Sequence, residues 1–170
     1  VWGGPTYAWS PDSRTIAVHY VDRRNMRKVP FPHYLGEETL ANNVRRGYPG
    51  DPNEYRTIGL FDVENGELKL LDLPDPTANR IVGFSWSFNG TLLLDQESDS
   101  ATDRWLYKID PADGRLQKIW HDYRETRVYT SIASAWHSDG ERVVFLSDLK
   151  DRYGLYLLTP GEKTPILLTN

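Results

Sequence analysis

The sequence predicts an all-β fold, a partial β-propeller of about three four-stranded antiparallel blades. A short phrase recurs three times, and the same order of strand-forming segments follows each copy. The copies read Trp9-Ser10-Pro11-Asp12-Ser13, Trp86-Ser87-Phe88-Asn89-Gly90 and Trp136-His137-Ser138-Asp139-Gly140. Asp or Asn followed by Gly or Ser readily adopts the positive-φ turns that reverse a strand. Each copy therefore predicts a hairpin, with its Trp as a large buried anchor.

The first unit covers residues 5–75 and has a short strand ahead of Trp9. Segments with β-type alternation follow at 15–22, 56–63 and 68–73, and the last two flank the turn Glu64-Asn65-Gly66-Glu67. Four antiparallel strands in this order are typical of a propeller blade.

The second and third units, residues 80–121 and 130–170, repeat this order. Their expected strands after the Trp phrase are 91–96, 104–110 and 115–120 in the second unit, and 142–147, 154–158 and 164–168 in the third. Trp86 and Trp136 are 50 residues apart. This interval is close to the roughly 40–50 residues of known propeller repeats.

The first unit carries a long insertion, since 77 residues separate Trp9 from Trp86 and the excess falls in residues 23–55. Its Pro and Gly content excludes a long helix and predicts an irregular loop or an arm. The arm either packs against its own blade or makes contacts beyond it. Its candidate interaction residues are the aromatic ones: Phe31, Tyr34, Tyr48 and Tyr55.

Three blades are too few to close a propeller, which needs about 4–8. Open sheet edges invite pairing with other chains. We therefore expect either a fragment of a longer protein or a chain that forms a homo-oligomer through the arm or its open blade edges.

The composition is that of a soluble globular domain, with 39% hydrophobic and 26% charged residues among 170. A net charge of −4 provides no basic field for nucleic acid, so no nucleic-acid partner is predicted. The sequence has no apolar run near the ~20 residues of a membrane span. It has no Cys, which excludes disulfides and thiolate zinc sites. Either an exported or periplasmic location or a cytoplasmic one remains open.

The residues predict no catalytic site, no metal site and no cofactor. The string nearest to a nucleophile elbow, Gly83-Phe84-Ser85-Trp86-Ser87, lacks the second Gly and lies on a predicted strand. The four histidines are scattered, at His19, His33, His121 and His137. The acidic run Asp95, Glu97, Asp99 and Asp103 lacks the spaced Gly and Glu of a calcium loop, which favours a solvated loop.

Two sets of residues resemble a known family. The segment 9–18, Trp-Ser-Pro-Asp-Ser-Arg-Thr-Ile-Ala-Val, is similar to the repeat of TolB-like, WD40-like and prolyl oligopeptidase propellers. The insertion, with Pro30-Phe31-Pro32-His33-Tyr34 and then Arg46-Gly47-Tyr48-Pro49-Gly50-Asp51-Pro52-Asn53, is more specific. It resembles the N-terminal propeller of dipeptidyl peptidase IV-like serine peptidases.

This resemblance implies a propeller that performs no bond chemistry. It would gate peptide access to an α/β-hydrolase domain of the same parent chain, and a pair of glutamates would bind the free amino terminus of the substrate. Glu37-Glu38 does not match that pair, because the family's glutamates precede the Trp-Ser-Pro strand; we expect them upstream of Val1. The alternative is a non-enzymatic TolB-like segment that mediates protein–protein interaction, although such blades do not need the arm.

Overall fold

The computed structural model describes residues 7–126, 133–149 and 153–169, and within them every regular element is a β-strand. Three sheets have four strands each, and a fourth sheet has two. The strands are β1 (Tyr7–Trp9), β2 (Thr15–Asp22), β3 (Lys28–His33), β4 (Leu40–Arg45), β5 (Tyr55–Asp62), β6 (Leu68–Leu70), β7 (Asn79–Trp86), β8 (Leu92–Ser98), β9 (Asp103–Ile109), β10 (Leu116–Tyr123), β11 (Ser134–Trp136), β12 (Val143–Ser147), β13 (Gly154–Leu158) and β14 (Ile166–Leu167).

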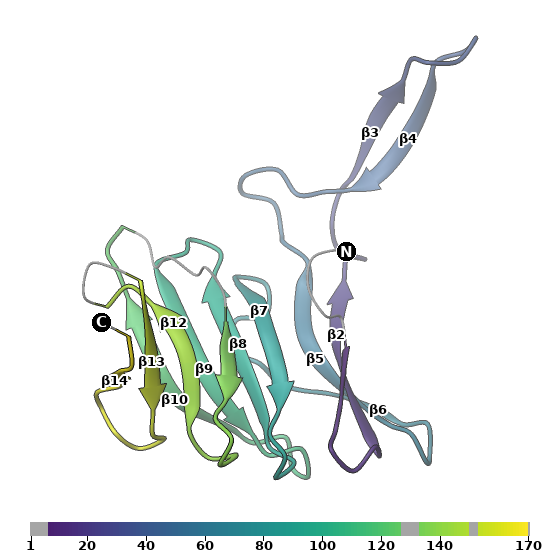
Figure 1. The fold of residues 1–170 in the computed structure, drawn as a ribbon. Helices are drawn as coiled ribbons and strands as arrows, with labels where there is room; N and C mark the ends of the chain where they lie inside the picture. The colour runs from purple at the N-terminus through teal and green to yellow at the C-terminus, as the bar shows by residue number, and fades with distance from the viewer. Residues whose placement is uncertain (1–6, 127–132, 150–152, 170) are drawn as a thin grey trace.

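The three four-stranded sheets are the blades of a partial propeller, and this confirms the predicted fold class. Blade 1 has the order β1-β2-β5-β6, blade 2 has β7-β8-β9-β10, and blade 3 has β11-β12-β13-β14. All neighbouring strands are antiparallel. The blades stand side by side, and the insertion projects away from them (Figure 1).

The recurrent phrase forms the same hairpin in each blade. The backbone N–H of the residue after each Trp donates to the residue that leads into the next strand, from Ser10 to Thr15 O, from Ser87 to Thr91 O and from His137 to Arg142 O, each at 2.8 Å. Positive φ angles occur in every copy, at Ser13, Gly90 and Gly140. The predicted turns are therefore confirmed.

Of the two predicted forms, an irregular loop or an arm, the insertion takes the second, because it contains a regular two-stranded hairpin, β3 and β4, that projects from the blades (Figure 1). The sequence prediction overestimated the disruptive effect of Pro30 and Pro32. These residues have the same parity along β3, so their nitrogens face the same side of the strand. Since β3 pairs only with β4, that side can be its open edge, where a missing N–H costs no ladder hydrogen bond.

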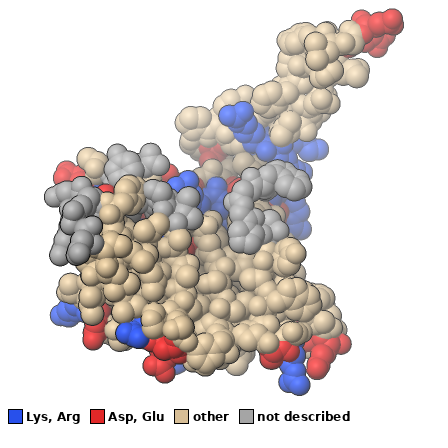
Figure 2. Space-filling model, in the orientation of Figure 1, with Lys and Arg blue, Asp and Glu red and all other residues tan. Residues whose placement is uncertain are grey.

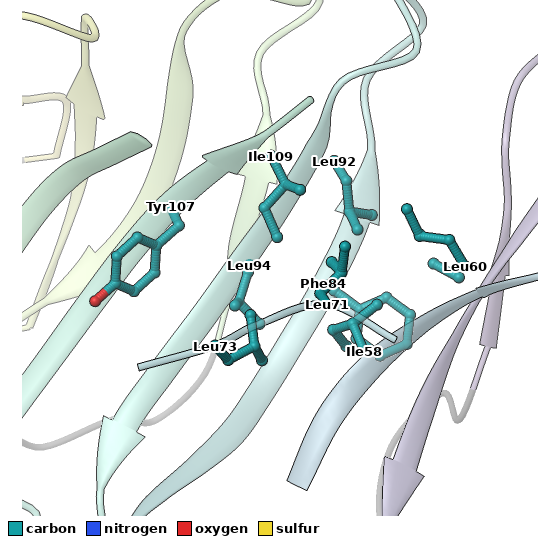
Figure 3. Packing of buried hydrophobic residues seen from close by; sticks show 10 residues of the cluster. Ile58, Leu60, Leu71, Leu73, Phe84, Leu92, Leu94, Tyr107 and Ile109 are labelled. Atoms are coloured by element: carbon teal, nitrogen blue, oxygen red, sulfur yellow. The ribbon is translucent and has the colours of Figure 1, made fainter. Parts of the chain in front are cut away.

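Apolar cores fill the spaces between blades. Between blades 1 and 2, the core comprises Ile58, Leu60, Leu71 and Leu73 of blade 1 and Phe84, Leu92 and Leu94 of blade 2 (Figure 3). Leu71 and Leu73 lie beyond the end of β6, which is shorter than predicted, but both are buried. Between blades 2 and 3, a second cluster includes Leu93, Leu106, Phe145 and Tyr156.

The Trp residues differ from the predicted buried anchors. Trp9 is 50% exposed, and Trp86 and Trp136 are half-buried. The two half-buried indoles join adjacent blades: Trp86 Nε1 donates to Ala8 O at 3.0 Å, and Trp136 Nε1 donates to Ser85 O at 3.1 Å. These Trp residues therefore connect blades in addition to filling the core of one.

Candidate functional site

The arm brings three of its four predicted interaction residues to the surface. Phe31 on β3 is 41% exposed, Tyr34 just beyond β3 is 73% exposed, and Tyr48 between β4 and β5 is 51% exposed. Tyr55 instead lies on β5 of blade 1 and is half-buried. The arm surface therefore includes the first three residues, while Tyr55 belongs to the blade.

The hairpin exposes other apolar side chains as well. Leu35 at its tip is 91% exposed, Leu40 is 61% exposed and Val44 is 46% exposed. Among the hairpin strands only Val29 is buried. A two-stranded hairpin is at best marginally stable by itself in water. This surface is therefore a candidate binding surface for another protein.

An ion-pair network fixes the root of the arm. Glu54 accepts a hydrogen bond from Arg23 and one of 3.0 Å from Arg56 Nε. Arg56 also donates to Asp99 of blade 2 at 2.8 Å, and Asn53 Nδ2 donates to the other oxygen of Asp99 at 2.9 Å. Burial alone would raise the pKa of Glu54, but the hydrogen bonds from Arg23 and Arg56 outweigh burial and lower it. The root is thus attached to both blades 1 and 2.

The stem above this root is held by further polar contacts. Arg27 pairs with Asp51 at 2.9 Å and lies over the ring of Tyr48, 5.6 Å from its centroid. Arg45 Nη1 donates to the carbonyl of Arg24 at 2.7 Å. These contacts order the arm near the blade, whereas its outer half has few.

Charge is divided along the arm. Basic side chains gather between the arm and the blades, and acidic side chains lie at the tip (Figure 2). The basic group consists of Arg23, Arg24, Arg27, Lys28, Arg45 and Arg46, and the tip carries Glu37 and Glu38. Hydrogen bonds from Arg24 lower the pKa of Asp22 at the arm base to about 2.

A hollow of about 380 Å³ below the root is lined by Tyr20, Arg24, Tyr55 and their neighbours.

Ser85, the nearest approach to a catalytic serine, lies in β7 as predicted, and its hydroxyl is buried without a hydrogen-bond partner. Between described residues, no serine hydroxyl is hydrogen-bonded to a histidine imidazole. His121 Nε2 instead contacts Asp103 at 2.7 Å, and its ring stacks on Trp105. The arrangement provides no activated nucleophile in the described part of the chain.

The acidic run does not form the predicted solvated loop. Asp95 and Glu97 are buried in β8, and each has a basic partner. Arg104 donates to both oxygens of Asp95, at 2.9 and 2.6 Å, and Arg80 pairs with Glu97. In the ladder Arg80 and Arg104 both lie opposite Glu97. Asp95 lies two residues before Glu97 on the same face of β8, so it is the diagonal neighbour of Arg104.

The Asp95–Arg104 pair also joins blade 2 to blade 3. Ser134 of β11 donates to Asp95 Oδ2 at 2.9 Å, and Arg104 Nη1 donates to Leu146 O at 2.7 Å. Sequence reasoning missed this network. The sequence feature that could have predicted the network is an Arg in the neighbouring strand, at a position that lies opposite the acidic run once the strands pair.

The fold and the arm agree with the comparison to known families. Residues 4–170 match the family described as the dipeptidyl peptidase IV (DPP IV) N-terminal region. The chain belongs to this family. The resemblance expected from the Trp-Ser-Pro repeat and the arm is therefore confirmed.

Two relatives of this DPP IV N-terminal region are each 24% identical to it. The probable dipeptidyl-aminopeptidase B of Uncinocarpus reesii aligns over 152 residues, 81% of this chain and 16% of the relative. The venom dipeptidyl peptidase 4 of Apis mellifera aligns over 163 residues, 89% of this chain and 20% of the relative. The chain thus spans a fifth or less of the length of these proteins.

Solved structures show the same fold. Porphyromonas gingivalis dipeptidyl peptidase 4 superposes with a TM-score of 0.83 at 17% identity, covering 96% of this chain and 24% of that one. A puromycin-hydrolyzing peptidase of Mycobacterium tuberculosis superposes with a TM-score of 0.62 at 15% identity, covering 97% of this chain and 23% of that one.

Within the described residues there is no helix that could cross a membrane.

Proposed function

We propose that this DPP IV N-terminal region is a non-catalytic propeller segment of a dipeptidyl peptidase IV-like serine peptidase. It gates peptide access to an α/β-hydrolase domain and packs on that domain, which supplies the catalytic chemistry. The family match over residues 4–170 carries the proposal. Its coverage of only 16–24% of the three dipeptidyl peptidases named above supports a role as one part of a larger enzyme.

The described polar groups also support a structural role. The buried carboxylates of β8 are paired with arginines, and the Asp95–Arg104 pair extends into blade 3. A general acid or base must instead be free to exchange a proton with a substrate. We therefore infer that the chain forms a rigid part of the propeller and holds no catalytic group. The amine-binding glutamates of the substrate site are expected upstream of Val1.

Activity of the isolated chain tests the non-catalytic role. We expect no hydrolysis of a chromogenic X-Pro dipeptide substrate by the purified 170-residue chain. Turnover that a serine-directed inhibitor abolishes would overturn the proposal. The parent reading frame gives a second test, because a Gly-x-Ser-x-Gly elbow followed by Asp and His is required in it. Without that elbow, the non-enzymatic, partner-binding alternative is favoured.

The arm is the proposed assembly surface of this propeller, and a second copy of the chain is its proposed partner. Its exposed apolar side chains have no core of their own to enter, and association would bury them. Replacing Tyr34 with Ser should weaken association in sedimentation equilibrium. The matched control is Tyr123→Ser, since Tyr123 is 61% exposed on blade 2, away from the arm. Equal effects of the two substitutions would contradict a role of the arm.

A further inference from the structure

The ends of the blades opposite to the arm carry an aromatic side chain that their turns do not require. The third position of the recurrent phrase is Pro11 in blade 1, Phe88 in blade 2 and Ser138 in blade 3. Pro and Ser are common turn residues, whereas Phe is not. Phe88 is 64% exposed, and its turn lies between the corresponding turns of blades 1 and 3 (Figure 1). The surroundings of Phe88 are therefore supplied by this chain on both sides.

Contacts with the neighbouring turn hold Phe88 in place. A Cβ added at Gly140 would lie 2.6 Å from Phe88 Cε1 and 2.8 Å from Asn89 Nδ2. The ring and the amide thus rest on the backbone of the blade 3 turn, at a position where only Gly leaves room. An exposed aromatic side chain that is already ordered loses little conformational entropy when a partner binds. Phe88 is therefore suited to a binding surface.

An apolar hollow of about 210 Å³ adjoins Phe88, between the turns of blades 1 and 2. The apolar part of its lining consists of Pro11, Trp86, Phe88 and Pro111. The indole N–H of Trp86 already donates to Ala8 O, so the ring presents an apolar surface to the hollow. A cavity of about 150 Å³ admits benzene. The hollow is therefore large enough for the side chain of a Phe or Leu residue from a partner.

A second hollow, of about 430 Å³, lies next to the first and shares part of its lining, namely Asn89, Gly90 and Pro111. Its lining includes two cations, Lys108 and Arg115. Neither forms an ion pair with a carboxylate in the described part of the chain. Lys108 Nζ instead lies over the ring of Trp136, 5.8 Å from its centroid. The two cations are thus available to an anionic group of a ligand.

The carboxylates that line these hollows are engaged by their own turns. Asp110, the acidic residue of the second hollow, accepts the backbone N–H of Ala112 at 3.0 Å. Asp12 of the first hollow accepts the hydroxyl of Ser10 at 2.6 Å and the backbone N–H of Arg14 at 3.1 Å. Two cations therefore face one carboxylate in the second hollow, which has a local excess of positive charge in a chain of net charge −4.

We propose that the two hollows bind a short extended peptide segment of another protein, with an apolar side chain in the first hollow and a carboxylate in the second. In an extended chain the side chains of residues i and i+2 point to the same side and are about 7 Å apart. One such pair reaches two adjoining hollows at once. The positive charge of the second hollow favours Glu or Asp over Lys or Arg at the second position. The site lies at the opposite end of the blades from the arm, so it is separate from the assembly surface.

Calorimetric titration with the peptide acetyl-Gly-Phe-Gly-Glu-Gly-amide tests the site, since this peptide carries one apolar side chain and one charge. We expect saturable binding to the 170-residue chain. Arg115→Glu and Phe88→Ser should each weaken binding roughly tenfold or more. Lys118→Glu is the matched control, because Lys118 is also exposed but lines neither hollow, and it should leave binding unchanged.

Peptide variants test the chemistry of the ligand. Replacing the Phe of the peptide with Ala, or its Glu with Lys, should weaken binding to the parent chain roughly tenfold. Phe88 and Arg115 are exposed, so both protein variants should fold, which circular dichroism verifies. Absence of saturable binding at about 1 mM peptide would overturn the proposal. Equal affinities of the Arg115→Glu and Lys118→Glu chains would overturn it as well, and so would a Lys-containing peptide that binds as tightly as the Glu-containing one.

Discussion

The buried Asp95–Arg104 pair provides the sharpest test of how these blades are held together. The two side chains are 2% and 1% exposed, and two hydrogen bonds of 2.9 and 2.6 Å join them. Asp95→Asn keeps the shape but leaves the buried Arg104 charge without the carboxylate to which it is hydrogen-bonded. Breaking a buried ion pair in this way costs about 3–5 kcal/mol. With a urea m-value of roughly 2 kcal/mol/M, the unfolding midpoint should fall by about 1.5–2.5 M.

Urea unfolding followed by circular dichroism measures this loss. The control is Glu64→Gln, which removes one member of an exposed pair with Arg14 at 3.8 Å and should change stability by less than about 1 kcal/mol. The double variant Asp95→Leu/Arg104→Met removes both charges and should lie within about 2 kcal/mol of the parent. A loss below about 1 kcal/mol in Asp95→Asn, or a double variant as unstable as the sum of both single variants, would refute the reasoning.

Three further predictions concern single positions. Burial lowers the pKa of His19, so as pH falls the unfolded chain binds the proton first, and stability should fall below about pH 6.5. The difference between the urea midpoints at pH 7.5 and 5.5 should therefore be smaller in His19→Leu than in the parent chain, whereas His33→Leu should keep the parent's difference. Glu54→Gln should lower the local opening free energy of the arm root by about 1–2 kcal/mol, measured by amide exchange, and unchanged exchange would contradict the network. Gly140→Ala should lower the thermal unfolding temperature more than Gly66→Ala does. Both glycines have positive φ, but only the Cβ added at Gly140 would approach the Phe88 ring, at 2.6 Å from Cε1. Equal losses in the two variants would argue against this contact.

The blade plan could be predicted from sequence because its signals are local. A turn phrase and the alternation after it lie within about a dozen residues, and strand pairing within a blade follows from them. The partners of Asp95 could not be predicted in the same way. Whether a carboxylate on a strand faces solvent or an arginine depends on register with the next strand and on the blade beyond it, and Ser134 is 39 residues away in sequence.

The structure of the arm also could not be predicted from local composition. Its prolines predicted irregular structure, because proline is usually excluded from paired strands, but an edge strand accepts proline wherever its nitrogen faces outward. Phe31, Tyr34 and Tyr48 are exposed, and their role in interaction stays a prediction. Tyr55 was assigned to the arm because the boundary with β5 could not be placed from composition.

The root of the arm links assembly to blade packing. Glu54 and Arg56 belong to the blade 1 side of the root, whereas Asp99 follows β8 of blade 2, and the chain of contacts through Arg56 requires both blades in place. A shift of blade 2 relative to blade 1 would therefore break the contacts that orient the arm. A ligand that binds one conformation more tightly stabilises that conformation, so a partner bound to the oriented arm should in turn stabilise the interface between blades 1 and 2. The same acidic and basic residues would then serve both the propeller wall and its assembly.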